Sequence, residues 1–195
     1  MRGLWMLPWW GRTSGTLTYA PVRPFRTVMP DATSSLPPAA ERVLQRFRQM
    51  GREEKMQALV GYATKLESLP DRYRDLDRAA FTVHECQTRV DVFPELRDGM
   101  LRFYADVNVR QSPTVAAFLS ILFSAVNDQP PAATLALPTD TARQLMDGIG
   151  LHARETGLNA MLARLKRAAA AAEAQVARGD RDGLVQAAAP ALGAR

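Results

Sequence analysis

Apolar residues recur with a helical period between Pro37 and Pro70. They fall on one face over residues 43–50, and the same spacing returns over residues 56–66. This spacing keeps one face of an α-helix against a core. Because Gly51 interrupts the pattern, the sequence predicts two amphipathic helices, the second of which ends at Pro70.

The period changes to two between residues 90 and 107. Val90 and Val92 alternate with their neighbours, and the alternation resumes after residue 100. The Asp98-Gly99 pair between the two runs is a two-residue hairpin signal. The sequence therefore predicts an antiparallel hairpin with one buried face.

Helical patterns return after this hairpin. Ser112-Pro113 is typical of a helix start, and the apolar run that follows predicts a helix buried on nearly all sides. A short helix is expected over residues 140–147, followed by a long one that carries Leu158 and Leu165. Helices, a meander of short strands and more helices together predict the α+β class, with a small antiparallel sheet packed against several α-helices.

We expect one domain over residues 37–177. Residues 178–195 are small, polar and rich in alanine, which predicts a flexible C-terminal tail. Residues 1–36 show neither period, and we expect an N-terminal extension that is disordered or not native.

The first 28 residues contain arginine and no acidic residue, as in an organellar transit peptide. A secretory signal fits less well, because Pro8 breaks the short apolar run. We favour an extension upstream of a true start at Met29. The expected location is the cytoplasm, or an organelle if residues 1–28 are a transit peptide.

Composition and charge narrow the functional classes. Hydrophobic residues make up 47% of the chain and charged residues 23%, as in ordinary globular domains. No apolar stretch approaches the ~20 residues that cross a bilayer. The net charge is +5, but residues 1–28 hold four arginines, which leaves +1 for residues 29–195. Since nucleic-acid binding needs a dense basic face, we expect neither nucleic acid nor a membrane as partner.

Cys86 is the only cysteine in the 195 residues, so the chain cannot form an internal disulfide. Free cysteines are commonly buried, but His84, Glu85, Gln87 and Thr88 make the surroundings polar. This polarity indicates a loop that faces water. An exposed lone thiol is a liability unless it is used, so the pattern favours a reactive thiol.

Several chemistries remain open for this thiol. A metal site could combine His84, Cys86, His152 and a carboxylate, but no CxxC or HxxxH spacing supports it. A Cys–His hydrolase could pair His84 with Cys86, but no oxyanion motif or glycine-rich elbow is present. A non-catalytic interaction protein with an incidental thiol is a further possibility.

The absence of a second cysteine favours sulfur transfer as the chemistry of Cys86. A lone thiolate can attack a persulfide sulfur and keep the transferred atom. A persulfide on Cys86 would meet no resolving thiol in the same chain. This favours a carrier over a disulfide oxidoreductase, which needs two cysteines.

Four segments, in order between about Arg42 and Arg167, carry a resemblance to a known family. They are YATKLESLP at 62–70, VHECQTRVDVF at 83–93, RFYADVNVRQSPTVAAFLSILFSAV at 102–126 and IGLHARETGLNAMLARLKRAA at 149–169. Together they resemble the SufE family, the sulfur-acceptor partners of cysteine desulfurases. Glu85 stands where many members have glycine, a departure that bears on partner choice.

The resemblance implies a SufE/IscU-like fold and a mechanism. Cys86 would take persulfide sulfur from a SufS-like, pyridoxal-phosphate-dependent cysteine desulfurase, stimulate that enzyme and pass the sulfur to a SufB-like iron–sulfur scaffold. The chain itself would keep no cofactor and no metal, as a monomer or homodimer. The residues expected to bind partners or support the loop are His84, Glu85, Gln87, Asp106 and Arg154.

Overall fold

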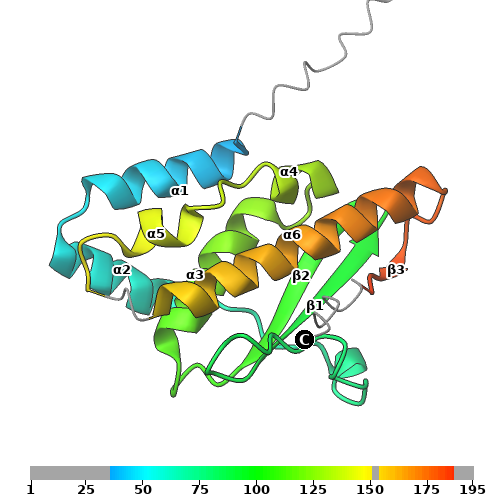
Figure 1. Ribbon diagram of the computed structural model, residues 1–195, viewed down its shortest axis with the longest axis horizontal. Coiled ribbons are helices and arrows are strands. Elements are labelled where there is room, and N and C mark those ends of the chain that lie inside the picture. Colours follow the sequence, from blue (N-terminus) through cyan, green and yellow to red (C-terminus); the bar gives the residue numbers. More distant parts are fainter. Residues whose placement is uncertain (1–35, 151–153, 187–195) are drawn as a thin grey trace, which may run out of the picture. The chain divides into compact units, whose positions relative to one another are not determined.

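The computed structural model describes residues 36–150 and 154–186, all within the compact unit that spans residues 34–195 (Figure 1). Residues 1–35, on which the prediction of an N-terminal extension rests, lie outside the described residues. The α+β class is confirmed. The elements in chain order are α1 (Pro38–Gln49), α2 (Arg52–Ala63), the 3-10 helix η1 (Asp71–Tyr73), β1 (Val90–Arg97), β2 (Met100–Val107), α3 (Pro113–Val126), α4 (Pro131–Leu135), α5 (Thr141–Met146), α6 (Glu155–Ala177) and β3 (Gly183–Leu184).

The predicted hairpin is confirmed. β1 and β2 are antiparallel, with Val92 opposite Ala105, and the connection consists of Asp98 and Gly99. Both turn residues have positive φ, 51° and 79°. This conformation matches the twist of the two strands and explains why the Asp-Gly pair marks the turn in the sequence.

The prediction that the hairpin buries one face is wrong, because both faces are covered. Alternate residues from Val90 to Ala105 pack into the core beneath the helices. On the opposite face, Phe93 contacts Tyr73 and Phe81, with ring centroids 5.5 and 4.8 Å apart. Tyr73 lies in η1 and Phe81 follows it in the chain. This segment is too short and irregular to show a helical or strand period, so the sequence did not predict the second covered face.

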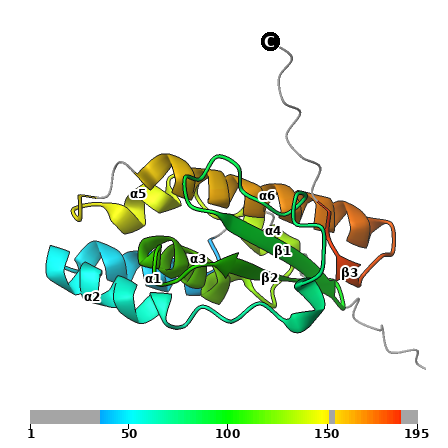
Figure 2. The same cartoon turned by 90° about the horizontal axis from the view of Figure 1, so that it is seen from below.

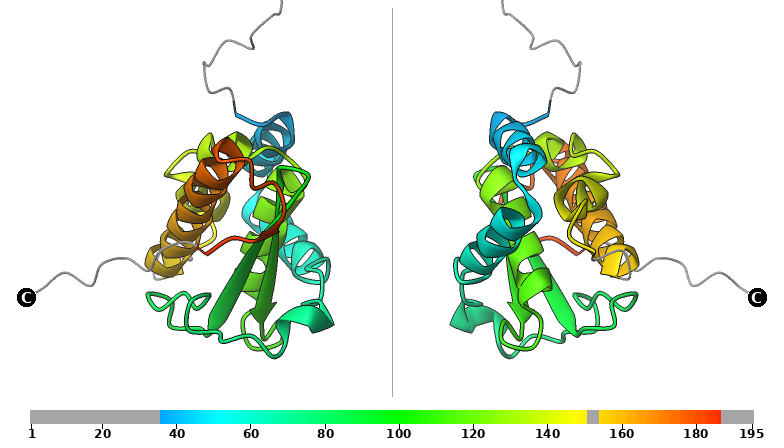
Figure 3. Two further views of the ribbon diagram at one scale, coloured as in Figure 1. Left: turned by 90° about the vertical axis from the view of Figure 1, so that its right-hand side faces the viewer. Right: turned by 90° about the vertical axis from the view of Figure 1, so that its left-hand side faces the viewer.

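The helical layer is divided between the two strands of the hairpin. α3 packs against β2, α1 and α2, whereas α6 packs against β1, α4 and α5. Figure 2 shows α6 on the β1 side and α1, α2 and α3 on the β2 side, and Figure 3 shows the same separation end on. As the sequence predicts, α3 is buried on nearly all sides, and Ala116, Phe118 and Leu119 have no exposed surface.

Two local features differ from the expected elements. α2 ends at Ala63, well before Pro70, and at this end the Thr64 hydroxyl donates a hydrogen bond to the Gly61 carbonyl at 3.0 Å. The short helix α4, opened by Pro131, has no periodic signal. Among the helices that the structure describes, none is long and apolar enough to cross a membrane.

The flexible tail expected from residue 178 includes residues that are folded, and residues 187–195 lie outside the described residues. Residues 183–184 form β3, which pairs antiparallel with β1, so the strand order is β2-β1-β3. Val185 donates its amide to the Pro94 carbonyl at 2.8 Å and is fully buried. The sequence pattern did not predict β3, because two residues are too few to show the alternation of a strand. The other domain bounds stay predictions.

Val185→Ala tests whether this C-terminal segment belongs to the core. Removal of two buried methyl groups should lower the free energy of unfolding by about 1.5 kcal/mol. Val60→Ala is the matched control, since Val60 is 62% exposed on α2 and should change stability little. Chemical denaturation measures both. Equal, negligible effects would mean that residues 183–185 are not part of the folded unit.

Candidate functional site

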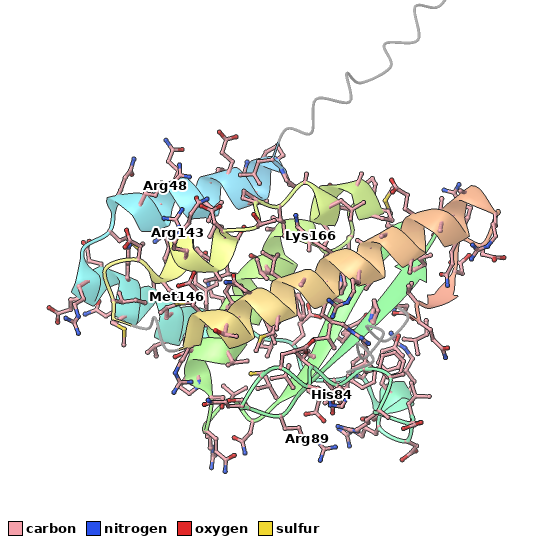
Figure 4. All side chains as sticks on the ribbon, in the orientation of Figure 1. Arg48, His84, Arg89, Arg143, Met146 and Lys166 are labelled. Atoms are coloured by element: carbon pink, nitrogen blue, oxygen red, sulfur yellow. The ribbon has the colours of Figure 1, made fainter. Side chains whose placement is uncertain are left out.

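Cys86 lies in a loop whose two ends are fastened to each other. We call residues 80–90 the cysteine loop. The Val83 amide donates to the Val90 carbonyl at 2.9 Å, and the Val92 amide donates to the Phe81 carbonyl at 2.9 Å. These bonds close the base of the loop against β1. Figure 4 labels two residues of this loop, His84 and Arg89.

The Cys86 side chain points inward, against the expectation of a thiol that faces water. Its neighbours Glu85 and Gln87 are exposed, but Cys86 itself is half-buried and packs against the core. The surface beneath it is Gly157 in the first turn of α6. A Cβ at position 157 would lie 3.3 Å from Sγ and 3.6 Å from the Cys86 Cα. The loop therefore approaches α6 as closely as it does because residue 157 has no side chain.

A cavity of about 650 Å³ opens beside the thiol. It brings together four of the residues singled out in the sequence, namely Glu85, Cys86, Gln87 and Arg154. Two others, His84 and Asp106, do not line it. The remaining lining residues come from the cysteine loop, the start of α3 and α6: Thr88, Gln111, Ser112, Val115, Thr156, Gly157, Leu158 and Met161.

Ser112 does not cap α3 as the sequence predicts. Its side chain makes no capping hydrogen bond, and its hydroxyl instead lies 3.1 Å from the Thr88 hydroxyl. Ser112 is buried, so this bond satisfies both hydroxyls and ties the C-terminal side of the cysteine loop to the start of α3.

Asp106 lies on the outer side of the hairpin, where it accepts a hydrogen bond from Arg78. Arg78 also donates to Asp91 at 3.2 Å, and Thr82 donates to Asp91 at 2.6 Å. Hydrogen bonds from Arg78 to Asp106, and next to Asp91, raise the pKa of Arg78 above its ordinary value. This network fastens the segment that enters the cysteine loop to both strands.

The described side chains around Cys86 form neither a metal-binding cluster nor a hydrogen-bonded Cys–His pair. His84 is exposed and makes no hydrogen bond with Cys86. No group of three or more His, Cys, Asp or Glu side chains within residues 36–150 and 154–186 is placed to hold a metal ion. His152, the third residue of the metal hypothesis, lies outside the described residues.

Sequence reasoning missed the residues that hold the cysteine loop in place. Gly157 carried a signal, since the Gly-Leu pair lies in a segment that resembles the family. Thr88, Ser112 and Arg78 carried none, because their roles depend on partners from distant elements.

Arg78→Met tests the network beneath the loop. Asp91 is only 1% exposed, so loss of its principal cation leaves a buried carboxylate poorly paired. We expect the free energy of unfolding to fall by about 2–3 kcal/mol. The control is Arg74→Met, because the Arg74–Asp71 pair is 65% and 86% exposed. Its loss should cost less than about 0.5 kcal/mol. Equal losses in a denaturant titration would contradict this role for Arg78.

Gly157→Ala tests the contact beneath the thiol, with Gly61→Ala as its control. Both glycines are helical, and nothing lies within 4 Å of a Cβ at position 61. Gly61→Ala should therefore stabilise the protein by about 0.5–1 kcal/mol. Gly157→Ala should lose that gain and speed alkylation of Cys86 about threefold, because the new methyl group displaces the loop. Equal stabilisation with unchanged alkylation would show that the loop does not rest on Gly157.

Comparison with known proteins agrees with this geometry. Residues 41–169 match SufE, the Fe-S metabolism associated domain. Uncharacterized SufE-like proteins from two strains of Mycobacterium tuberculosis, CDC 1551 / Oshkosh and ATCC 25618 / H37Rv, are each 33% identical over 144 residues, covering 70% of this chain and 94% of theirs.

A solved structure is also similar. It is the solution structure of a hypothetical protein from Thermus thermophilus, with 29% identity and a TM-score of 0.61, covering 71% of this chain and 98% of that one. The match over most of the described domain places the chain in Fe–S metabolism and implies a cysteine desulfurase as partner. The chain belongs to the SufE family.

Proposed function

We propose that this protein is a sulfur acceptor, with Cys86 as the residue that receives the sulfur. The observation that carries the proposal is the position of the thiol. The sole cysteine lies at a cavity, half-buried, in a loop fastened at both ends. Family membership supplies the donor, a cysteine desulfurase that holds sulfur as a persulfide.

The transfer balances without any further reagent. The Cys86 thiolate attacks the outer sulfur of the donor persulfide, and a new S–S bond forms on Sγ. The S–S bond within the donor breaks, its electron pair leaves on the donor cysteine as a thiolate, and the thiol proton passes to solvent. A second exchange of the same kind hands the sulfur to an iron–sulfur scaffold of the SufB kind.

The cavity suits a persulfide that must be kept between these steps. Leu158 and Met161 give it an apolar floor, whereas Gln87, Gln111 and Arg154 make its rim polar. Arg154 is exposed at the start of α6 and supplies positive charge beside the anionic sulfur. We assign Glu85 and Gln87 to partner contact, because both are exposed on either side of the thiol.

His84 and Asp106 have supporting roles in this proposal. His84 is exposed at the tip of the cysteine loop, where a docking partner can reach it. Asp106 acts through Arg78, which fastens the segment that leads into the loop. We place the reaction in the cytoplasm, a compartment that keeps a free thiol reduced.

Intact-mass measurement tests the proposal. The protein is incubated with a SufS-type desulfurase, pyridoxal phosphate and isotopically labelled cysteine. The wild type should gain the mass of one labelled sulfur atom, and treatment with a reductant should remove it. Cys86→Ser should gain none, since serine provides no thiol.

Desulfurase turnover in the same mixtures distinguishes the alternatives. The proposed acceptor stimulates turnover, and Cys86→Ser abolishes the stimulation while its thermal unfolding matches that of the wild type. Equal stimulation by both forms would instead indicate an interaction protein with an incidental thiol. Stoichiometric zinc in the purified protein, found by elemental analysis, would indicate the metal-binding alternative.

A further inference from the structure

A buried arginine in α6 lies beneath the cysteine loop. Arg164 is only 4% exposed. Its Nη2 donates a hydrogen bond to the carbonyl of Ala80, the first residue of the loop. Its Nε is buried and has no hydrogen-bond partner among the residues that the structure describes. The mechanism proposed above does not use this side chain.

Stability alone does not explain a charge at this position. Within the described ranges, no carboxylate lies at ion-pair distance from Arg164. Burial lowers the pKa of Arg164, and the neighbouring charge of Arg167 lowers it further. A buried cation with an unpaired N–H is costly, and an apolar side chain of similar volume is commonly as stable or more so.

The charge of Glu85, the exposed residue before Cys86, opposes this lowering of the pKa, but no ion pair joins the two side chains. The direct attachment of Arg164 to the cysteine loop is therefore the hydrogen bond at Ala80.

One face of α6 contacts the cysteine loop at Cys86 and at Ala80. Gly157, Met161 and Arg164 are spaced by four and then three residues, so they share one face of the helix. Gly157 meets the Cys86 side chain, and the fully buried Met161 lines the cavity. Arg164 completes this face at Ala80. The same helix face thus contacts the loop from its start to its thiol.

We propose that Arg164 is a positioning residue that tethers the start of the cysteine loop to α6 and so helps to keep Cys86 against Gly157. The tether itself follows from contacts within the chain. Its consequence for sulfur transfer rests on the proposed function. Because the loop is fastened to β1 at its base, the tether governs how often the tip leaves Gly157 and exposes the thiol.

The rate of alkylation of Cys86 by iodoacetamide, a neutral reagent, tests the tether without any partner protein. Arg164→Met removes the hydrogen bond to Ala80 and should raise the rate about tenfold, because the loop leaves α6 more often. Arg164→Lys, which keeps a charged donor, should retain most of the protection.

A neighbouring arginine provides the control. Arg167→Met removes a charge from the same helix without removing the hydrogen bond to Ala80, and it should remain within about twofold of the wild type.

Two outcomes would overturn the tether, namely an unchanged rate in Arg164→Met or an equal response in Arg167→Met. If Arg164→Met does not fold, Arg164→Gln takes its place, because its shorter amide side chain loses the hydrogen bond to Ala80. A wild type that gains no sulfur in the desulfurase assay refutes the proposed function and leaves the alkylation result standing. Sulfur gain with unaltered alkylation in the variants refutes the tether alone.

Discussion

Nearly complete burial of α3 is the constraint on which the arrangement depends. A helix that is apolar on nearly all sides must be covered on all of them, and β2, α1 and α2 provide that cover. This places the helices on one face of the hairpin and leaves Phe93 on the other face. The segment around η1 covers Phe93 and then runs directly into the cysteine loop. The site is thus located by the packing of residues that take no part in its chemistry.

The cysteine loop combines a fixed base with a polar tip. Hydrogen bonds to β1 and the Thr88–Ser112 contact fasten its two sides, while the residues beside the thiol face solvent. The thiol itself rests against Gly157. Such an arrangement partly shields the Cys86 sulfur from bulk solvent and leaves the polar side chains beside it exposed. Both properties suit a protein that holds sulfur between two exchanges.

Two arginines near the loop use their charge in different ways. Arg78 is paired with Asp91 and Asp106, so its positive charge is balanced within a hydrogen-bonded network. Arg164 is deeply buried, and its direct partner among the described residues is a carbonyl. The first arrangement stabilises the fold. The second contributes more to the placement of the loop than to the free energy of unfolding, because a lone buried cation carries a large desolvation cost.

Periodicity and local turn chemistry determined much of this protein from the sequence alone. The helices, the Asp98-Gly99 hairpin, the buried α3 and the solitary thiol all follow from interactions between residues close together in the chain. Only the tertiary structure decided what lies beneath that thiol. Its contact with Gly157, the hydrogen bond from Arg164 to Ala80 and the pairing of β3 with β1 each join residues far apart in the chain. A polar surround predicted an exposed Cys86, yet the side chain turns inward, because its direction depends on the packing of α6 against the loop, which local sequence does not reveal.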